Sequence, residues 1–112
     1  MNLTALFIAI VSVESSGGKY LIGDQGRSVG PAQIQEIVIR DVNRIAGTRY
    51  TVSDRFDFAK SREMFRIYTD HYGKKYGVPV TDEVRARIWN GGPSGPQKSS
   101  TQKYWAKVKA RL

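Results

Sequence analysis

One acidic residue, Glu14, lies where an apolar segment meets a run of small residues. Val11 and Val13 precede it, and the sequence SSGG follows it directly. Apolar neighbours disfavour the charged form of a carboxyl group and keep it protonated closer to neutral pH, as a general acid must be. The small residues leave room for a substrate. Glu14 is therefore a candidate general acid, although a glutamate at a helix end is more often a solvated surface group.

Glu14 belongs to the first of four motifs that follow one another along the chain. They read VESSGG, IGDQGRSVGPAQIQ, ARIWNGGPSG and YWAKV. The first two resemble the pattern shared by soluble lytic transglycosylases and goose-type lysozymes. The last two resemble invertebrate-type lysozymes. Each block alone is a weak signal, but the combination is specific to the lysozyme superfamily and suggests a bacterial or phage version.

This resemblance implies that Glu14 is the catalytic acid. Invertebrate-type lysozymes use a second carboxylate, an Asp in the loop after the Glu, and Asp24 is the only acid in that loop here. Soluble lytic transglycosylases need no such partner, because the N-acetyl group of the sugar can assist. The role of Asp24 therefore distinguishes a hydrolysing lysozyme from a lytic transglycosylase. It could equally be a turn residue in the sequence GDQG.

The resemblance also implies a substrate cleft. Gln33 and Asn90 match positions whose side-chain amides line the sugar site, and amides both donate and accept hydrogen bonds, as N-acetyl groups do. Gly91 and Gly92 would let the backbone approach a substrate. Among the aromatic residues, Tyr104 is the one expected in the cleft.

The resemblance therefore implies a peptidoglycan-cleaving glycosidase, a lysozyme or muramidase. It would cut the β-1,4 bond between N-acetylmuramic acid and N-acetylglucosamine. The first alternative is a lytic transglycosylase that yields anhydromuropeptides. The second is a non-catalytic basic module that binds nucleic acid or an anionic surface. No metal ion or organic cofactor is expected.

The charge distribution bears on partners. Eighteen Lys and Arg face ten Asp and Glu, which gives a net charge of +8. From Arg85 onward there are seven basic residues and no acidic one, so the excess is C-terminal. Such a segment attracts anionic wall polymers, or it simply solubilises the surface. Nucleic acid is not expected because no nucleic-acid-binding signature accompanies the charge.

Length and composition narrow the remaining possibilities. A chain of 112 residues fits one domain, so we expect a single lysozyme-like catalytic domain over residues 1–112, and a monomer. The sequence has no cysteine, which excludes disulfides and thiol nucleophiles, and stability must come from packing. A single histidine, His71, cannot build a histidine-based metal site. With no serine in a nucleophile-elbow sequence, His71 is expected to be structural or exposed.

The N-terminal apolar run, MNLTALFIAIVSV, predicts an amphipathic first helix. Its large apolar residues recur at helical spacing: Leu3, Leu6, Phe7, Ile10 and Val11. It lacks a basic start and a cleavage site, so we do not expect a cleaved signal peptide, and it is too short to span a membrane. The protein is expected to act on the bacterial wall, as an extracellular, periplasmic or phage-delivered enzyme.

The rest of the chain predicts a mainly helical α+β domain of about five helices and a small β-hairpin. Glycines gather at 17–30, where Tyr20 to Ile22 is the β-like run, and again at 91–95. A second helix is expected from Pro31, in its first turn, to Gly47, at its end. Its expected buried stripe contains Ile34, Ile37, Val38, Val42 and Ile45.

Three more helices follow from capping residues and apolar spacing. One is expected to begin near Asp57 and to end at Gly73, and a short one to begin at Thr81. The last is expected to begin at Ser99 or Ser100. Its apolar side would carry Tyr104, Trp105, Val108 and Leu112, and another side Lys103, Lys107 and Arg111.

Overall fold

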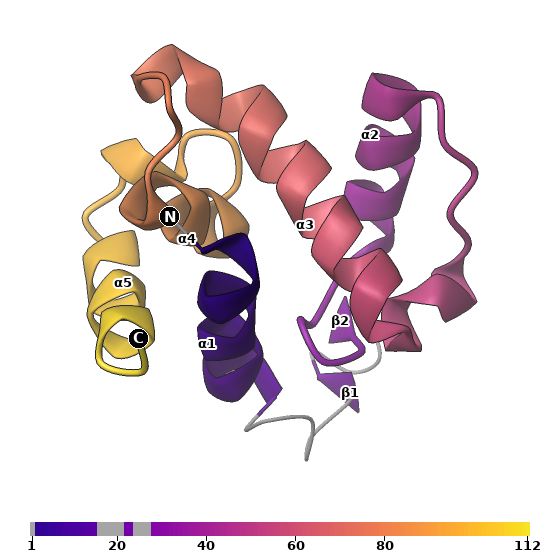
Figure 1. Ribbon diagram of the computed structural model, residues 1–112, viewed down its shortest axis with the longest axis horizontal. Coiled ribbons are helices and arrows are strands. Elements are labelled where there is room, and N and C mark those ends of the chain that lie inside the picture. Colours follow the sequence, from indigo (N-terminus) through magenta and orange to yellow (C-terminus); the bar gives the residue numbers. More distant parts are fainter. Residues whose placement is uncertain (1, 16–21, 24–27) are drawn as a thin grey trace.

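The computed structural model describes residues 2–15, 22–23 and 28–112, and in this part of the chain helices dominate (Figure 1). The α-helices are α1 (Leu3–Ser15), α2 (Glu36–Ala46), α3 (Phe58–Gly73), α4 (Asp82–Gly91) and α5 (Thr101–Lys109). Short 3-10 helices η2 (Val52–Phe56), η3 (Lys74–Tyr76) and η4 (Gly95–Gln97) connect them. Strands β1 (Ile22–Gly23) and β2 (Ser28–Val29) pair antiparallel, with Ile22 opposite Val29. The predicted mainly helical class is confirmed.

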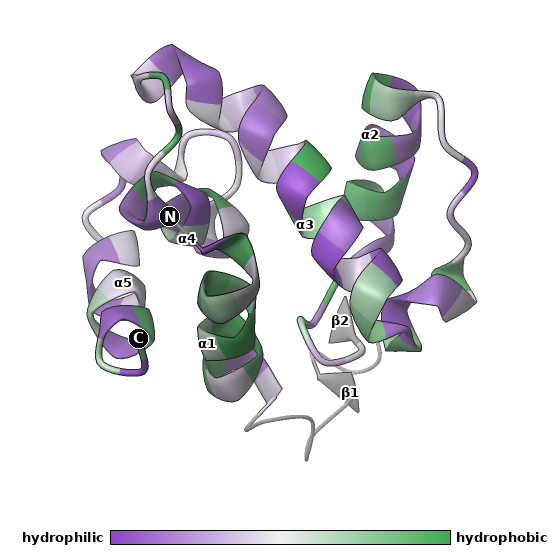
Figure 2. Cartoon of the chain, in the orientation of Figure 1, coloured by the Kyte–Doolittle hydropathy of each residue, from purple (hydrophilic) through white to green (hydrophobic). Residues whose placement is uncertain are grey.

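Helix α1 is the apolar centre of the fold. It lies between α5 and α3 and contacts both as well as α4 (Figure 1). Its sequence is apolar on most sides, and Figure 2 shows it as a largely hydrophobic helix. Leu6, Phe7 and Ile10 are fully buried. The Phe7 ring packs against the Phe65 ring, with ring centres 5.4 Å apart. None of the described helices is both long and apolar enough to cross a membrane.

Helix ends follow the capping residues that the sequence offers. The Asp57 side chain accepts a hydrogen bond from the amide of Lys60 (2.8 Å), which caps α3. The Thr81 hydroxyl accepts one from the amide of Val84 (3.2 Å), which caps α4. Gly47 ends α2 in the left-handed conformation, with φ 67°. These three predicted helix boundaries are confirmed.

The predicted start of the second helix is wrong. Pro31 lies in a turn, and α2 begins five residues later, at Glu36. The turn contains two left-handed residues, Gly30 (φ 88°) and Gln33 (φ 54°), and neither conformation fits a right-handed helix. Ile37 was expected in the buried stripe but is 68% exposed.

A buried hydroxyl, that of Thr101, helps to hold the segment between α4 and α5. Thr101 Oγ1 lies 2.7 Å from the carbonyl oxygen of Gly95 and accepts a hydrogen bond from Nε of Arg87 (2.8 Å). Because Gly95 itself packs onto the backbone of α4, the chain after Gly91 folds back tightly. This close return places α5 against α4 and α1.

Replacing Gly95 with alanine should therefore destabilise the protein. A Cβ atom at this position would lie 1.9 Å from the carbonyl oxygen of Arg87, which is backbone and cannot rotate away. We expect Gly95→Ala to lower the free energy of unfolding by about 3 kcal/mol, as for other overpacked positions. Chemical denaturation measures this loss. Ser94→Ala, an exposed neighbour whose side chain makes no capping bond, is the control and should change little.

Candidate active site

Glu14 and Tyr104 meet although they are far apart in the sequence. Glu14 lies in the last turn of α1, and Tyr104 lies in α5. The Tyr104 hydroxyl donates a hydrogen bond to Oε2 of Glu14 at 2.5 Å. Burial of the phenol raises the pKa of Tyr104 well above its usual value, and the nearby Glu14 carboxylate raises it further. Tyr104 therefore remains a hydrogen-bond donor and fixes the orientation of the Glu14 carboxyl group.

Glu14 opens into a cavity of about 470 Å³. Polar groups from two other parts of the chain line this cavity beside Glu14, namely Gln33 and Gln35 before α2, and Asn90 at the end of α4. Apolar walls come from α2 and from the Tyr68 and Trp89 rings. A carboxyl group beside convergent amides in a concave site has the composition of a ligand-binding pocket.

Gln33 has a strained backbone. A non-glycine residue at φ 54° costs on the order of 1 kcal/mol and persists only where surrounding contacts maintain it. The side-chain amide of Gln33 donates to the carbonyl of Gly30 (2.9 Å), and its backbone amide donates to the same carbonyl (3.0 Å). The turn thus directs Gln33 into the cavity rather than into a helix.

Trp89 joins the two walls that carry the amides. Its indole Nε1 donates to the carbonyl of Ala32 at 3.1 Å, which fixes the turn before α2 against α4. Its ring packs edge-on against Phe65, with ring centres 5.1 Å apart. The spacing between Gln33 and Asn90 therefore depends on a partly buried tryptophan whose polar and apolar parts are both satisfied.

Gly91 and Gly92 follow Asn90 along the rim of the cavity. Gly92 has φ 83°, a conformation that side chains rarely adopt, and its amide donates to the carbonyl of Ile88 (2.8 Å). A Cβ atom on Gly91 would lie 2.5 Å from the Thr101 side chain. The fold therefore favours glycine at both positions, at Gly92 for its backbone angle and at Gly91 for its contact with Thr101.

Known proteins resemble this chain in sequence. No family model matches it. A lysozyme of Magallana gigas is 36% identical over 81 residues, which cover 72% of this chain and 58% of that protein. Lysozyme 1 of Crassostrea virginica is 32% identical over 84 residues, which cover 75% of this chain and 45% of that protein. The chain thus spans about half the length of these relatives.

Solved structures agree over almost the whole chain. The crystal structure of Tapes japonica lysozyme has a TM-score of 0.79 and 29% identity, and the match covers 94% of this chain and 86% of that one. Meretrix lusoria lysozyme in complex with Aeromonas hydrophila PliI has a TM-score of 0.80 and 29% identity, with 95% and 87% covered. This chain belongs to the lysozyme superfamily. The predicted resemblance to invertebrate-type lysozymes is confirmed.

The lysozyme motifs converge in space. Glu14, Gln33, Asn90 and Gly91 line the same cavity, and Tyr104 contacts Glu14 directly. Asp24 lies outside the described residues. His71 packs edge-on against Tyr72 in α3 and does not line this cavity.

Sequence reasoning missed several residues that line the Glu14 cavity. Ile37 and Val38 were expected in the buried stripe of a helix, and Tyr104 was the one aromatic residue expected in the cleft, yet Ile37, Val38, Tyr68 and Trp89 all line the cavity. No signal in the apolar spacing distinguishes a core face from a cleft wall. Among the described residues, no three His, Cys, Asp or Glu side chains are grouped closely enough to hold a metal ion.

Proposed function

We propose that this chain is a peptidoglycan-cleaving glycosidase, a lysozyme or muramidase, with one catalytic domain over residues 1–112. Its substrate would be the β-1,4 bond between N-acetylmuramic acid and N-acetylglucosamine. The observation that carries the proposal is the Glu14 carboxyl group, oriented by Tyr104 and opening into a cavity lined by amides. The lysozyme relatives support the same activity.

Glu14 would act as the general acid. It donates its proton to the glycosidic oxygen while positive charge develops at the anomeric carbon of the sugar. Bond cleavage then leaves an oxocarbenium-like centre, which a second carboxylate or the substrate acetamide stabilises. In this proposal Glu14 would supply the acid, and Asp24 would supply the second carboxylate.

Binding of the substrate would depend on Gln33, Asn90 and the backbone at Gly91. Side-chain amides can donate to the acetamide oxygen and accept from its N–H, which suits a neutral N-acetyl sugar. Gly91 lines the same cavity and has no side chain to keep a substrate away from its backbone. Tyr104 is too buried to stack on a sugar, with 9% of its surface exposed, so it acts as a positioning residue for Glu14.

Changing Glu14 to glutamine tests the proposal directly. Glutamine keeps the shape of the side chain but cannot supply the acid proton, so Glu14→Gln should lower the rate of wall lysis by roughly 10²- to 10⁴-fold. Turbidity loss of purified cell walls measures this rate. The free energy of unfolding should remain close to that of the wild type.

Glu36→Gln serves as the matched control. Glu36 lies in the first turn of α2, its side chain is 59% exposed, and it does not line the cavity. Wall lysis should be unaffected by this change. A Glu14→Gln variant that kept more than about a tenth of the wild-type rate would exclude Glu14 as the acid.

Asp24 decides between hydrolysis and transglycosylation. We propose that it is the second carboxylate, so that water completes the reaction and reducing ends are released. Asp24→Asn should then reduce activity by at least about tenfold, and mass spectrometry of wild-type muropeptides should find reducing ends. Near-normal activity of the variant, together with anhydro ends, would instead identify a lytic transglycosylase in which Asp24 is a turn residue.

The C-terminal helix would hold the enzyme close to an anionic bacterial wall. Lys103 and Lys107 of α5 are exposed, as is Arg111, two residues after the end of α5, and none of the three forms an ion pair with a described acidic residue. Glu63 and Asp70 of α3 and Glu83 of α4 instead pair with arginines of the same two helices, such as Asp70 with Arg85 at 2.7 Å. The positive field of α5 is therefore not cancelled within this part of the fold.

Changing Lys103, Lys107 and Arg111 together to glutamine should weaken binding to intact walls and flatten its dependence on salt. Pull-down of the enzyme with walls at increasing ionic strength measures both effects. Cleavage of short soluble oligosaccharides should change little. Equal losses on walls and on soluble substrate would mean that these residues act in the cleft or in folding.

A control variant removes the same charge elsewhere on the surface. It replaces three exposed cations outside α5 with glutamine: Arg40, Arg49 and Lys75. If its binding to walls fell as far as that of the α5 variant, net charge rather than the α5 face would explain the attraction.

A further inference from the structure

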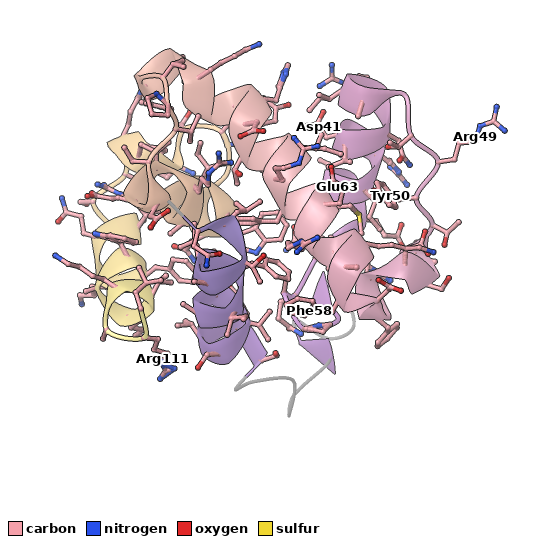
Figure 3. The ribbon with its side chains drawn as sticks, in the orientation of Figure 1. Asp41, Arg49, Tyr50, Phe58, Glu63 and Arg111 are labelled. Carbon is pink, nitrogen blue, oxygen red and sulfur yellow. The ribbon has the colours of Figure 1, made fainter. Side chains whose placement is uncertain are left out.

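A polar cluster lies between α2 and α3, and its residues are not among those that line the Glu14 cavity. Asp41 of α2 accepts a hydrogen bond from the hydroxyl of Tyr72 in α3 and one from Nε of Arg44 (3.2 Å). Arg44 Nη2 also donates to the Tyr72 hydroxyl at 3.3 Å. Figure 3 shows Asp41 in the gap between the two helices. The three side chains therefore form one mutually bonded group.

This cluster continues the walls of the Glu14 cavity. Asp41 lies three residues after Val38 and four after Ile37, so it projects from the same side of α2 as these two cavity residues, roughly 5 Å further along the helix. Tyr72 lies four residues after Tyr68, which also lines the cavity, and their rings are 5.0 Å apart. Helices α2 and α3 thus both extend from the cavity to the cluster.

The cluster is accessible to a ligand. The Asp41 side chain is 22% exposed and the Arg44 side chain is 63% exposed. Burial alone would raise the pKa of Asp41, but hydrogen bonds from Tyr72 and Arg44 outweigh it and lower the pKa. Asp41 is therefore ionised at neutral pH and offers acceptor oxygens beside the guanidinium donors of Arg44.

The charge balance selects the kind of ligand. Asp41 and Arg44 neutralise each other, so the pair does not favour a strongly anionic group. Together they can accept from one hydroxyl and donate to its neighbour, and the Tyr68 and Tyr72 rings lie beside them. A hexopyranose matches this arrangement, because it carries adjacent hydroxyls around a ring whose face is apolar.

We propose that Asp41, Arg44 and Tyr72 form a subsite that binds the hydroxyls of a sugar unit remote from the bond at Glu14. The inference rests on the proposed function, because it places a further unit of the same glycan strand. The subsite contributes to binding and not to chemistry. It would lead the enzyme to favour long strands over short oligosaccharides.

A binding experiment in the Glu14→Gln background tests the subsite without cleavage. The ligand is the hexasaccharide of N-acetylglucosamine, and calorimetry gives the Kd. Asp41→Asn and Arg44→Gln should each raise the Kd about tenfold, as expected for the loss of a hydrogen bond to a charged group. Arg44→Gln keeps the bond between Asp41 and Tyr72, so it tests the subsite even if Asp41→Asn does not fold.

Arg49→Gln is the matched control. Arg49 is also an exposed arginine, but it projects from the loop after α2 away from Asp41 (Figure 3). Its replacement should leave the Kd for the hexasaccharide unchanged. A loss of affinity equal to that of Arg44→Gln would show a general effect of charge and would overturn the subsite.

Steady-state kinetics separate binding from a merely structural role. With Glu14 intact, Arg44→Gln should raise KM for long soluble glycan strands about tenfold and leave kcat unchanged, because the reacting groups are untouched. An unchanged Kd, or a fall in kcat alongside the rise in KM, would overturn the inference. A wild-type chain that cleaves no glycan would contradict the proposed function, and the Kd values would still decide the subsite.

Discussion

Burial of α1 is the constraint on which the rest of the structure depends. Its sequence is so apolar that α3, α4 and α5 must all pack against it, and no disulfide supports the arrangement because the chain has no cysteine. Full burial of a side chain the size of Phe7 contributes about 2 to 3 kcal/mol. The same packing fixes the last turn of α1, and with it the place of Glu14. The candidate acid is thus held by the core rather than by a loop.

Polar groups at the site are positioned by contacts between segments far apart in the chain. Tyr104 reaches Glu14 from α5, and Trp89 reaches the carbonyl of Ala32 from α4. Each bond is made by an aromatic side chain whose ring is packed and whose polar atom is satisfied. A site built in this way loses little conformational entropy when the substrate binds, and such preorganisation favours electrostatic and acid catalysis.

Much of the fold could be predicted from local signals. Asp57, Thr81 and Gly47 mark helix ends because capping depends on the residue and its immediate neighbours. The turn at Pro31 could not be predicted, because a contact with a distant residue, the hydrogen bond from Trp89 to the carbonyl of Ala32, helps to hold it. Motif resemblance brought the candidate site residues together, but apolar spacing treated Ile37 as core when it forms a cleft wall. The contact between Glu14 and Tyr104 joins the two ends of the chain and has no local signature.

The central claim is that a glycosidic oxygen of the glycan sits at Glu14 in this cavity. The most direct test is a crystal structure of the Glu14→Gln variant with a bound oligosaccharide of N-acetylglucosamine. Our account predicts a glycosidic oxygen within roughly 3 Å of the side-chain amide at position 14, since a general acid must be within hydrogen-bonding reach of the atom that it protonates. An oligosaccharide bound away from the cavity, or one whose glycosidic oxygens all lie beyond that reach, would contradict the account.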